Sequence, residues 1–155
     1  MKNKLTVWLL CGAPGSGKST YGKALMNKLP NTERVCPDEF RAKFGTGEDD
    51  QSVSKQAFDA SFKAEEEYLK EGKSVIIDAT NTHRKGRKSF IDIARKYGAN
   101  VNALVFNVDK QTLITRNKKR GDEGGRNVPE WVIDRMLLNY KCPSVPDEVD
   151  DIKFF

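Results

Sequence analysis

Residues 5–19 read LTVWLLCGAPGSGKS, a short apolar run that leads directly into a glycine-rich segment. The apolar run from Leu5 to Leu10 is continuous rather than alternating, as expected for a strand that is covered on both faces. The residues from Gly12 to Ser19 fit the pattern G-x-x-x-x-G-K-[ST], which needs a strand before it and a helix after it. This stretch therefore predicts a buried strand, a phosphate-binding turn and a helix that begins at Lys18.

The residue types in this turn suit a nucleoside triphosphate. Glycines let successive backbone N–H groups point at phosphate oxygens, and the N-terminus of the following helix adds a positive dipole end. The ammonium group of Lys18 would reach the β- and γ-phosphates, and the hydroxyl of Ser19 would bind Mg²⁺. We therefore expect ATP or another nucleoside triphosphate, together with Mg²⁺. The predicted phosphate contacts are Gly12, Gly15, Ser16, Gly17, Lys18, Ser19 and Thr20.

Strands and helices alternate along the rest of the chain. The predicted strands are Leu5–Leu10, Arg34–Cys36, Ser74–Asp78, Val101–Val108 and Asp151–Phe155. The predicted helices are Lys18–Leu29, Asp38–Phe44, Val53–Glu71, Arg84–Tyr97, Asp109–Lys119 and a last one that begins at Pro129. We expect Asp38 and Asp109 to cap their helices. This order favours a single α/β domain over residues 1–155, with a mostly parallel sheet and helices on both faces. Ligands of such sheets bind at the carboxyl ends of the strands.

The composition fits a folded domain that contacts an anion. The chain has 155 residues, 27 lysines and arginines, 22 aspartates and glutamates, and a formal net charge of +5. Residues 84–96 and 110–126 hold the excess of cations, which suggests nucleic acid or a nucleotide as a partner. Solvated helix faces would explain these two segments equally well. No stretch approaches the ~18–20 apolar residues of a membrane span, so we expect no membrane contact and a cytoplasmic location in a bacterial or phage-infected cell.

A few rarer residues narrow the chemistry further. The three cysteines are widely spaced and form no C-x-x-C pair, so reduced thiols are expected rather than a disulfide framework or a metal site. His83 is the only histidine, which excludes a catalytic histidine pair, and we expect it on a solvated loop. Trp8 and Trp131 lie in apolar patterns and are expected in the core rather than on a surface that stacks on bases.

Candidate residues for the acceptor side follow the second and third predicted strands. Asp38 and Arg41 are three residues apart and would share one helix face. A carboxylate at this place could accept the proton of an attacking hydroxyl, and Arg41 could hold an acceptor phosphate. A helix cap and a surface arginine would explain the pair equally well. Asp78 ends the run SVIID, where it would orient Mg²⁺ or, alternatively, cap a turn.

Three arginines surround a glycine-rich segment near residue 121. Arg120 and Arg126 flank the stretch GDEGG, and Arg116 lies four residues before Arg120. Arginines on a mobile flap would stabilise the charge that spreads over a transferring phosphoryl group, and the flap would exclude water. We therefore expect residues 116–128 to form an arginine-bearing lid, with Arg116 on the nucleotide.

Four segments together resemble the polynucleotide 5′-hydroxyl kinase domain of phage and cellular end-healing enzymes. They are GAPGSGKST, PDEFR, EGKSVIIDATNTHRKGR and RNKKRG with the later NVP, and the resemblance runs over nearly the whole chain. The resemblance implies a P-loop kinase-like fold and transfer of the γ-phosphate of ATP to the 5′-OH end of RNA or DNA.

The resemblance also implies roles for single residues. Asp38 is similar to the general base of the family, and Arg41 is similar to the arginine that holds the phosphate 3′ to the acceptor nucleotide. Arg120 is similar to the lid arginine that contacts the transferring phosphoryl group. By the same resemblance, Lys18 acts in catalysis and Asn81 binds the substrate.

The chain departs from the family at two points. Some members read Asp-Thr-Asn where this chain has Ala79, Thr80 and Asn81, and its own aspartate stands one place earlier at Asp78. Many members also carry a phosphatase or ligase domain, and none is recognisable here, so a kinase-only protein is expected.

Other functions remain open at this stage. A small-molecule kinase, a nucleoside monophosphate kinase or a non-catalytic ATP-binding module would share the glycine-rich loop. A monophosphate is already an anion and needs no general base, so Asp38 followed by Arg41 favours a hydroxyl acceptor. A GTPase would need N-K-x-D, and the stretch NKKR at residues 117–120 lacks the aspartate.

Overall fold

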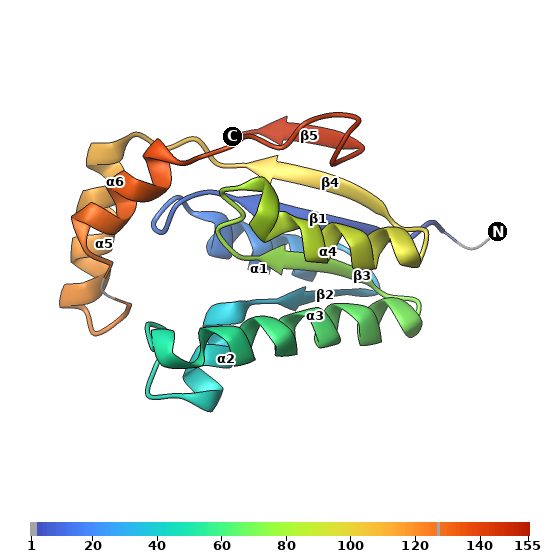
Figure 1. Cartoon of the computed structure of the whole chain (residues 1–155), viewed down its shortest axis with the longest axis horizontal. Helices are drawn as coiled ribbons and strands as arrows, with labels where there is room; N and C mark the ends of the chain where they lie inside the picture. Colours follow the sequence, from blue (N-terminus) through green and yellow to red (C-terminus); the bar gives the residue numbers. More distant parts are fainter. Residues whose placement is uncertain (1–2, 127) are drawn as a thin grey trace.

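The computed structural model describes residues 3–126 and 128–155. Five strands form one sheet in the order β2-β3-β1-β4-β5, and every pairing in it is parallel (Figure 1). The strands are β1 (Thr6–Cys11), β2 (Thr32–Val35), β3 (Ser74–Asp78), β4 (Asn100–Val105) and β5 (Asp151–Phe154). The predicted α/β class and the parallel sheet are therefore confirmed, including the edge strand at the end of the chain.

Among the described residues, six α-helices connect and cover these strands. They are α1 (Lys18–Lys28), α2 (Pro37–Phe44), α3 (Ser54–Lys70), α4 (Arg84–Lys96), α5 (Lys110–Asp122) and α6 (Glu130–Leu138), and a 3₁₀ helix at Gln51–Val53 precedes α3. Helices α3 and α4 contact one face of the sheet, and α1 packs on the other. Figure 1 shows α5 and α6 beyond the carboxyl ends of the strands, at the edge where a ligand is expected. None of the helices in the described part of the chain has the length and apolarity that crossing a bilayer requires.

Strand β1 occupies the middle of the sheet. Leu10 pairs with Asp78 of β3 on one side and with Leu104 of β4 on the other. The side chains of β1 that face α3 and α4 are fully buried with those of β3 and β4, and Leu10 faces α1. This burial on both faces explains the continuous apolar run of the sequence.

Two helix starts show how local chemistry sets the elements. Asp109 caps α5 as predicted, because its carboxylate accepts the N–H of Thr112 at 2.9 Å. Asp38 is not a cap, contrary to the prediction. Cys36 precedes α2 and Pro37 is its first residue, a position that suits proline because the missing N–H would have no helical partner. The carboxylate of Asp38 therefore does not cap the backbone of its own helix and is available to side chains.

The C-terminal half contains two further differences. Helix α5 continues through Asp122, so the first part of the predicted lid is helical rather than a loose flap. Asn127, which belongs to the predicted lid, lies outside the described residues. Trp131 was expected in the core, but 64% of it is exposed, because Ile133 rather than Trp131 takes the buried position of α6.

Most cations of the 84–96 segment have partners within the protein. Arg87 is fully buried and forms two hydrogen bonds, of 2.9 and 3.0 Å, to the carboxylate of Glu148. Its Nη1 donates to the backbone carbonyls of Asn81 and Lys141 at 2.8 and 2.7 Å. Three others of this segment pair with Asp92, Asp150 and Glu66. This segment therefore fits a structural role better than a nucleic-acid surface.

Glu65 is an isolated carboxyl group inside α3. The side chain is fully buried, and neither of its oxygens has a hydrogen-bond partner among the described residues. Burial, together with a smaller effect of the nearby charge of Glu66, raises the pKa of Glu65 to about 9. Glu65 is therefore neutral in the folded protein at pH 7.

Glu65→Gln should make the protein more stable at pH 8, and the gain should shrink toward pH 5. The unfolded chain releases this proton near pH 4.5, whereas the folded protein keeps it until about pH 9. Wild-type stability therefore falls as the pH rises through this window, by at most about 1.4 kcal/mol per pH unit. Urea unfolding between pH 5 and 9 measures the slope. Glu67→Gln, on the exposed side of the same helix, is the control, and equal slopes for both variants would contradict the assignment.

Candidate active site

The glycine-rich loop joins β1 to α1 and takes the conformation that its glycines allow. Gly15 and Gly17 have φ angles of 87° and 91°, which residues with a Cβ rarely adopt. A Cβ at Gly15 would also lie 2.8 Å from the amide nitrogen of Asn117. The N–H of Gly12 donates to the carbonyl of Thr80 at 2.9 Å, so the loop is fixed to the segment that follows β3.

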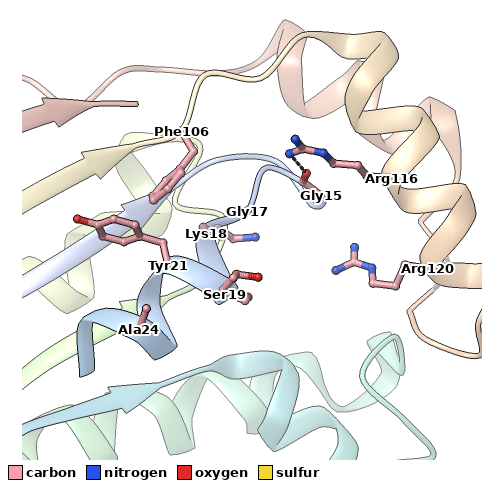
Figure 2. A pocket seen from close by; sticks show the side chains of 10 residues that line it. Gly15, Gly17, Lys18, Ser19, Tyr21, Ala24, Phe106, Arg116 and Arg120 are labelled. Carbon is pink, nitrogen blue, oxygen red and sulfur yellow. Dashed lines mark hydrogen bonds between the residues drawn. The ribbon is translucent and has the colours of Figure 1, made fainter. Parts of the chain in front are cut away.

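A cavity of about 660 Å³ lies against this loop and α1. Its walls are Gly15, Gly17, Lys18, Ser19, Thr20, Tyr21, Ala24, Phe106, Arg116 and Arg120. Figure 2 shows Arg116 and Arg120 reaching from α5 toward the loop that carries Lys18 and Ser19. Most of the predicted phosphate contacts and both arginines therefore meet in one place. The exceptions are Gly12 and Ser16, which are buried and do not line this cavity.

Asn117 connects helix α5, which carries the first part of the predicted lid, to the glycine-rich loop. The sequence alone did not predict this role. The side-chain N–H₂ of Asn117 donates to the carbonyls of Pro14 and Leu113 at 2.6 and 2.8 Å. Its Oδ1 accepts a hydrogen bond of 2.6 Å from Arg120. Arg116 adds a contact of 3.1 Å to the carbonyl of Gly15 (Figure 2). The spacing R-N-x-x-R was visible in the sequence, but the contacts to the loop depend on the fold.

The far end of this cavity is aromatic, which was also not predicted. Tyr21 and Phe106 line it, with ring centroids 5.5 Å apart (Figure 2). The ring of Phe155 stacks on that of Phe106, with ring centroids 4.8 Å apart, and so holds Phe106 in place. A polar end with cations and a flat apolar end are the two parts that a nucleotide site needs.

A second cavity, of about 110 Å³, is also lined by Lys18. Asp38, Arg41, Asp78 and Arg126 are among its lining residues, and Lys18 lines both cavities. Burial lowers the pKa of Lys18, while the charges of Asp78 and Asp38 counteract this effect. The carboxylates therefore stabilise the charged form of a lysine that stands between the two cavities.

Asp38 is held by two arginines from different parts of the chain. Arg41, one turn along α2, forms an ion pair with Oδ1, and Nη1 of Arg126 lies 2.8 Å from Oδ2. Arg41 is itself held by Ser54, at 3.1 Å, and lies over the ring of Phe58. The structure thus brings together the predicted base, the predicted acceptor arginine and Arg126 of the predicted lid.

The surroundings of Asp78 fit a role at a magnesium ion. Arg34 binds Oδ2 of Asp78 at 2.8 and 2.6 Å, whereas the buried Oδ1 has no partner among the described residues. Ser19 supplies a hydroxyl in the adjoining cavity. One free carboxylate oxygen and one hydroxyl suit an ion that keeps several waters and binds chiefly through phosphates. No group of three or more acidic, histidine or cysteine side chains is assembled for a metal among the described residues.

Asn81 lies apart from the other predicted residues. It is buried, has a φ of 48°, and donates from its amide to the carbonyl of Leu10 at 2.8 Å. The backbone carbonyl of Asn81 accepts a hydrogen bond from Arg87. These contacts give Asn81 a structural role between β1 and the segment after β3. Its contact with a substrate stays a prediction.

Asn117→Ala should weaken the binding of magnesium ATP by roughly ten-fold. The change leaves Arg120 without its anchor and removes the contact between α5 and the loop, a loss on the order of 1–3 kcal/mol. Isothermal titration calorimetry measures the dissociation constant. Lys118→Ala, the exposed neighbour on α5, is the matched control. The assignment is wrong if both variants bind ATP as the wild type does.

Comparison with known proteins places this arrangement in a family. The sequence model of an AAA domain family (AAA_33) matches residues 7–143. Transcription factor bHLH140 of Arabidopsis thaliana is 35% identical over 99% of this chain, and L-seryl-tRNA(Sec) kinase of Methanococcus maripaludis is 28% identical over 88%. The bifunctional polynucleotide phosphatase/kinase of Schizosaccharomyces pombe is 26% identical over 94%. The chain spans only 16%, 52% and 33% of these three proteins.

Two further proteins extend the comparison. A chain in the structure of the Pnkp1/Rnl/Hen1 RNA repair complex superposes with a TM-score of 0.78 at 27% identity, covering 90% of this chain and 45% of that one. Adenylate kinase of Phocaeicola vulgatus is 26% identical over 89% of this chain and 80% of its own length. The glycine-rich loop and the walls of both cavities lie within residues 7–143. The chain belongs to this AAA domain family and has the fold of a P-loop kinase.

Proposed function

We propose that this P-loop kinase transfers the γ-phosphate of ATP to the 5′-hydroxyl end of RNA or DNA, with Asp38 as the general base. One observation carries the proposal: Lys18 and Asp38 line the same small cavity, and Lys18 also lines the larger one. A phosphate held at Lys18 would therefore stand between the nucleotide and a carboxylate. A hydroxyl group placed in the small cavity would have a proton acceptor beside it.

The arginines around Asp38 suit an acceptor that also carries a phosphate. Both oxygens of Asp38 are engaged by Arg41 and Arg126. An acceptor phosphate offers these guanidinium groups another oxygen anion to bind, and binding it would release the carboxylate toward the hydroxyl. A 5′-OH nucleotide within a strand has such a phosphate on its 3′ side.

On the donor side, the chain supplies positive charge where the transferring phosphoryl group would develop its charge. Lys18 and the N-terminus of α1 would hold the β- and γ-phosphates, and Arg120 would reach the same region from α5. Arg116 would contact the nucleotide beside Gly15. Ser19 and Asp78 would hold Mg²⁺, which neutralises phosphate charge when it is bound.

The names of several relatives support a nucleic-acid acceptor. L-seryl-tRNA(Sec) kinase and polynucleotide phosphatase/kinase are both named for nucleic-acid substrates, and the Pnkp1 structure is of an RNA repair complex. Because this chain covers only about half or a third of these proteins, their activities serve only as support for the proposal.

A nucleotide kinase is the second candidate, and the similarity to adenylate kinase favours it. Arg41 and Arg126 would bind the phosphate of a nucleoside monophosphate equally well. Asp38 argues against this acceptor, because a carboxylate beside an anionic nucleophile raises the barrier and supplies no needed proton transfer.

Asp38→Asn should lower phosphate transfer to a 5′-OH oligonucleotide by roughly 10²-fold or more, with little change in ATP binding. Labelled ATP is offered to a 5′-OH oligonucleotide, a nucleoside 3′-phosphate, a nucleoside monophosphate and simple sugars. Asp59→Asn, an exposed aspartate of α3 that pairs only with Lys55 among the described residues, is the control. Label on the monophosphate but not on the oligonucleotide would overturn the proposal.

Arg41→Ala should raise the KM for the nucleic-acid acceptor by ten-fold or more and leave the KM for ATP nearly unchanged. The reason is the loss of a charge-assisted contact to the acceptor phosphate. Steady-state kinetics with each substrate varied in turn measure both constants. An equal rise of both KM values would remove Arg41 from the acceptor side.

A further inference from the structure

A third cavity adjoins the acceptor side of the candidate active site. It has a volume of about 650 Å³, within the roughly 300–1,000 Å³ of ligand sites. Gln51, Thr80, Arg126 and Met136 line both this cavity and the small one that contains Asp38. A molecule with its end at Asp38 would therefore continue into this space, which we call the α6 cavity.

The α6 cavity contains an aromatic side chain that the core does not use. Trp131 lines it from α6 and is 64% exposed. Arg135 and Asn139 follow Trp131 at intervals of four residues, so they share its helix face and line the same cavity. An exposed tryptophan beside an arginine offers a flat apolar surface and a charge to the same ligand.

Positive charge dominates the mouth of the α6 cavity. Arg126 and Arg135 line it, and Asp49 is the one carboxylate among its lining residues. Within the described residues, no ion pair engages Arg135. This excess of positive charge favours an anionic occupant over an uncharged, apolar one.

The walls of the α6 cavity are joined before any ligand binds. The N–H of Lys141, just after α6, donates to the carbonyl of Thr82 at 2.7 Å, and Thr82 lines the cavity. The backbone carbonyl of Lys141 in turn accepts a hydrogen bond from the buried Arg87. The relative position of α6 and the segment after β3 is therefore fixed, which reduces the entropy lost on binding.

We propose that the α6 cavity binds the nucleotide that follows the acceptor nucleotide in a strand, with its base stacked on Trp131 and its phosphate held by Arg135. The proposal rests on the proposed function, because it takes Asp38 as the place of the 5′ end. Stacking on an aromatic side chain tolerates every base, so this site selects a strand of two or more nucleotides rather than a sequence.

The binding step is measured first, without turnover. A short 5′-OH oligonucleotide is titrated into the Trp8→Phe variant, in which Trp131 is the only tryptophan. Stacking should quench its fluorescence, whereas a nucleoside 3′-phosphate, which ends at the acceptor position, should not. Fluorescence anisotropy of a label at the 3′ end of the oligonucleotide measures binding independently. Binding without quenching of Trp131 would overturn the proposal, and so would a failure to bind.

Kinetics then separate this site from the acceptor pocket. Trp131→Ala and Arg135→Ala should each raise the KM for the oligonucleotide on the order of ten-fold and leave the KM for ATP and the nucleoside 3′-phosphate unchanged. Trp131→Phe should restore most of the loss. Leu138→Ala, which changes an 83% exposed residue of the same helix outside the cavity, is the matched control.

The outcomes distinguish the two proposals. If the wild type phosphorylates neither acceptor, the proposed function fails, and the quenching experiment still decides whether a strand binds at Trp131. If the wild type phosphorylates both acceptors and the two α6 variants act on both as the wild type does, the proposed function stands and the strand site is wrong. Equal losses on both acceptors would also reject the strand site, because they would assign Trp131 to the acceptor pocket.

Discussion

The parallel pairing of β1 with both of its neighbours is the constraint on which the site depends. Because β1 is paired to β3 and β4 in the same direction, the residues after Leu10, Asp78 and Val105 emerge at one edge of the sheet. Three segments are therefore neighbours without being close in sequence: the glycine-rich loop, the end of β3 with Asp78, and the end of β4 with Phe106. Hydrogen bonds from Gly12 to Thr80 and from Asn81 to Leu10 then fix these segments to one another.

Charge is arranged around this edge in alternating signs. Lys18 faces Asp38 and Asp78, Asp78 is held by Arg34, and Asp38 is held by Arg41 and Arg126. Each of these charges has an opposite neighbour, which offsets the cost of removing it from water. The same arrangement leaves the cations able to exchange a carboxylate for a phosphate, because both are oxygen anions of similar geometry.

Local patterns predicted the elements well, and most of the residues predicted to contact phosphates line one cavity. The strand Ser74–Asp78 and the start of α1 at Lys18 agree with the structure residue for residue, since burial and glycine spacing act over short distances. The contacts of Asn117 and Tyr21 were missed, because they depend on how distant segments pack. Trp131 was wrongly placed in the core, since helical periodicity alone does not say which side of the apolar stripe a neighbouring element covers.

The buried guanidinium of Arg87 has a consequence for the minimal unit that can fold. It binds Glu148 near the end of the chain, Lys141 after α6, and Asn81, whose amide holds the strand that precedes the glycine-rich loop. A truncation before residue 148 would leave the charge of Arg87 buried without its carboxylate partner. It would also loosen the segment that holds the glycine-rich loop. Glu148 is thus part of the scaffold that supports the nucleotide-binding loop, and a shortened crystallisation or fusion variant needs to retain it.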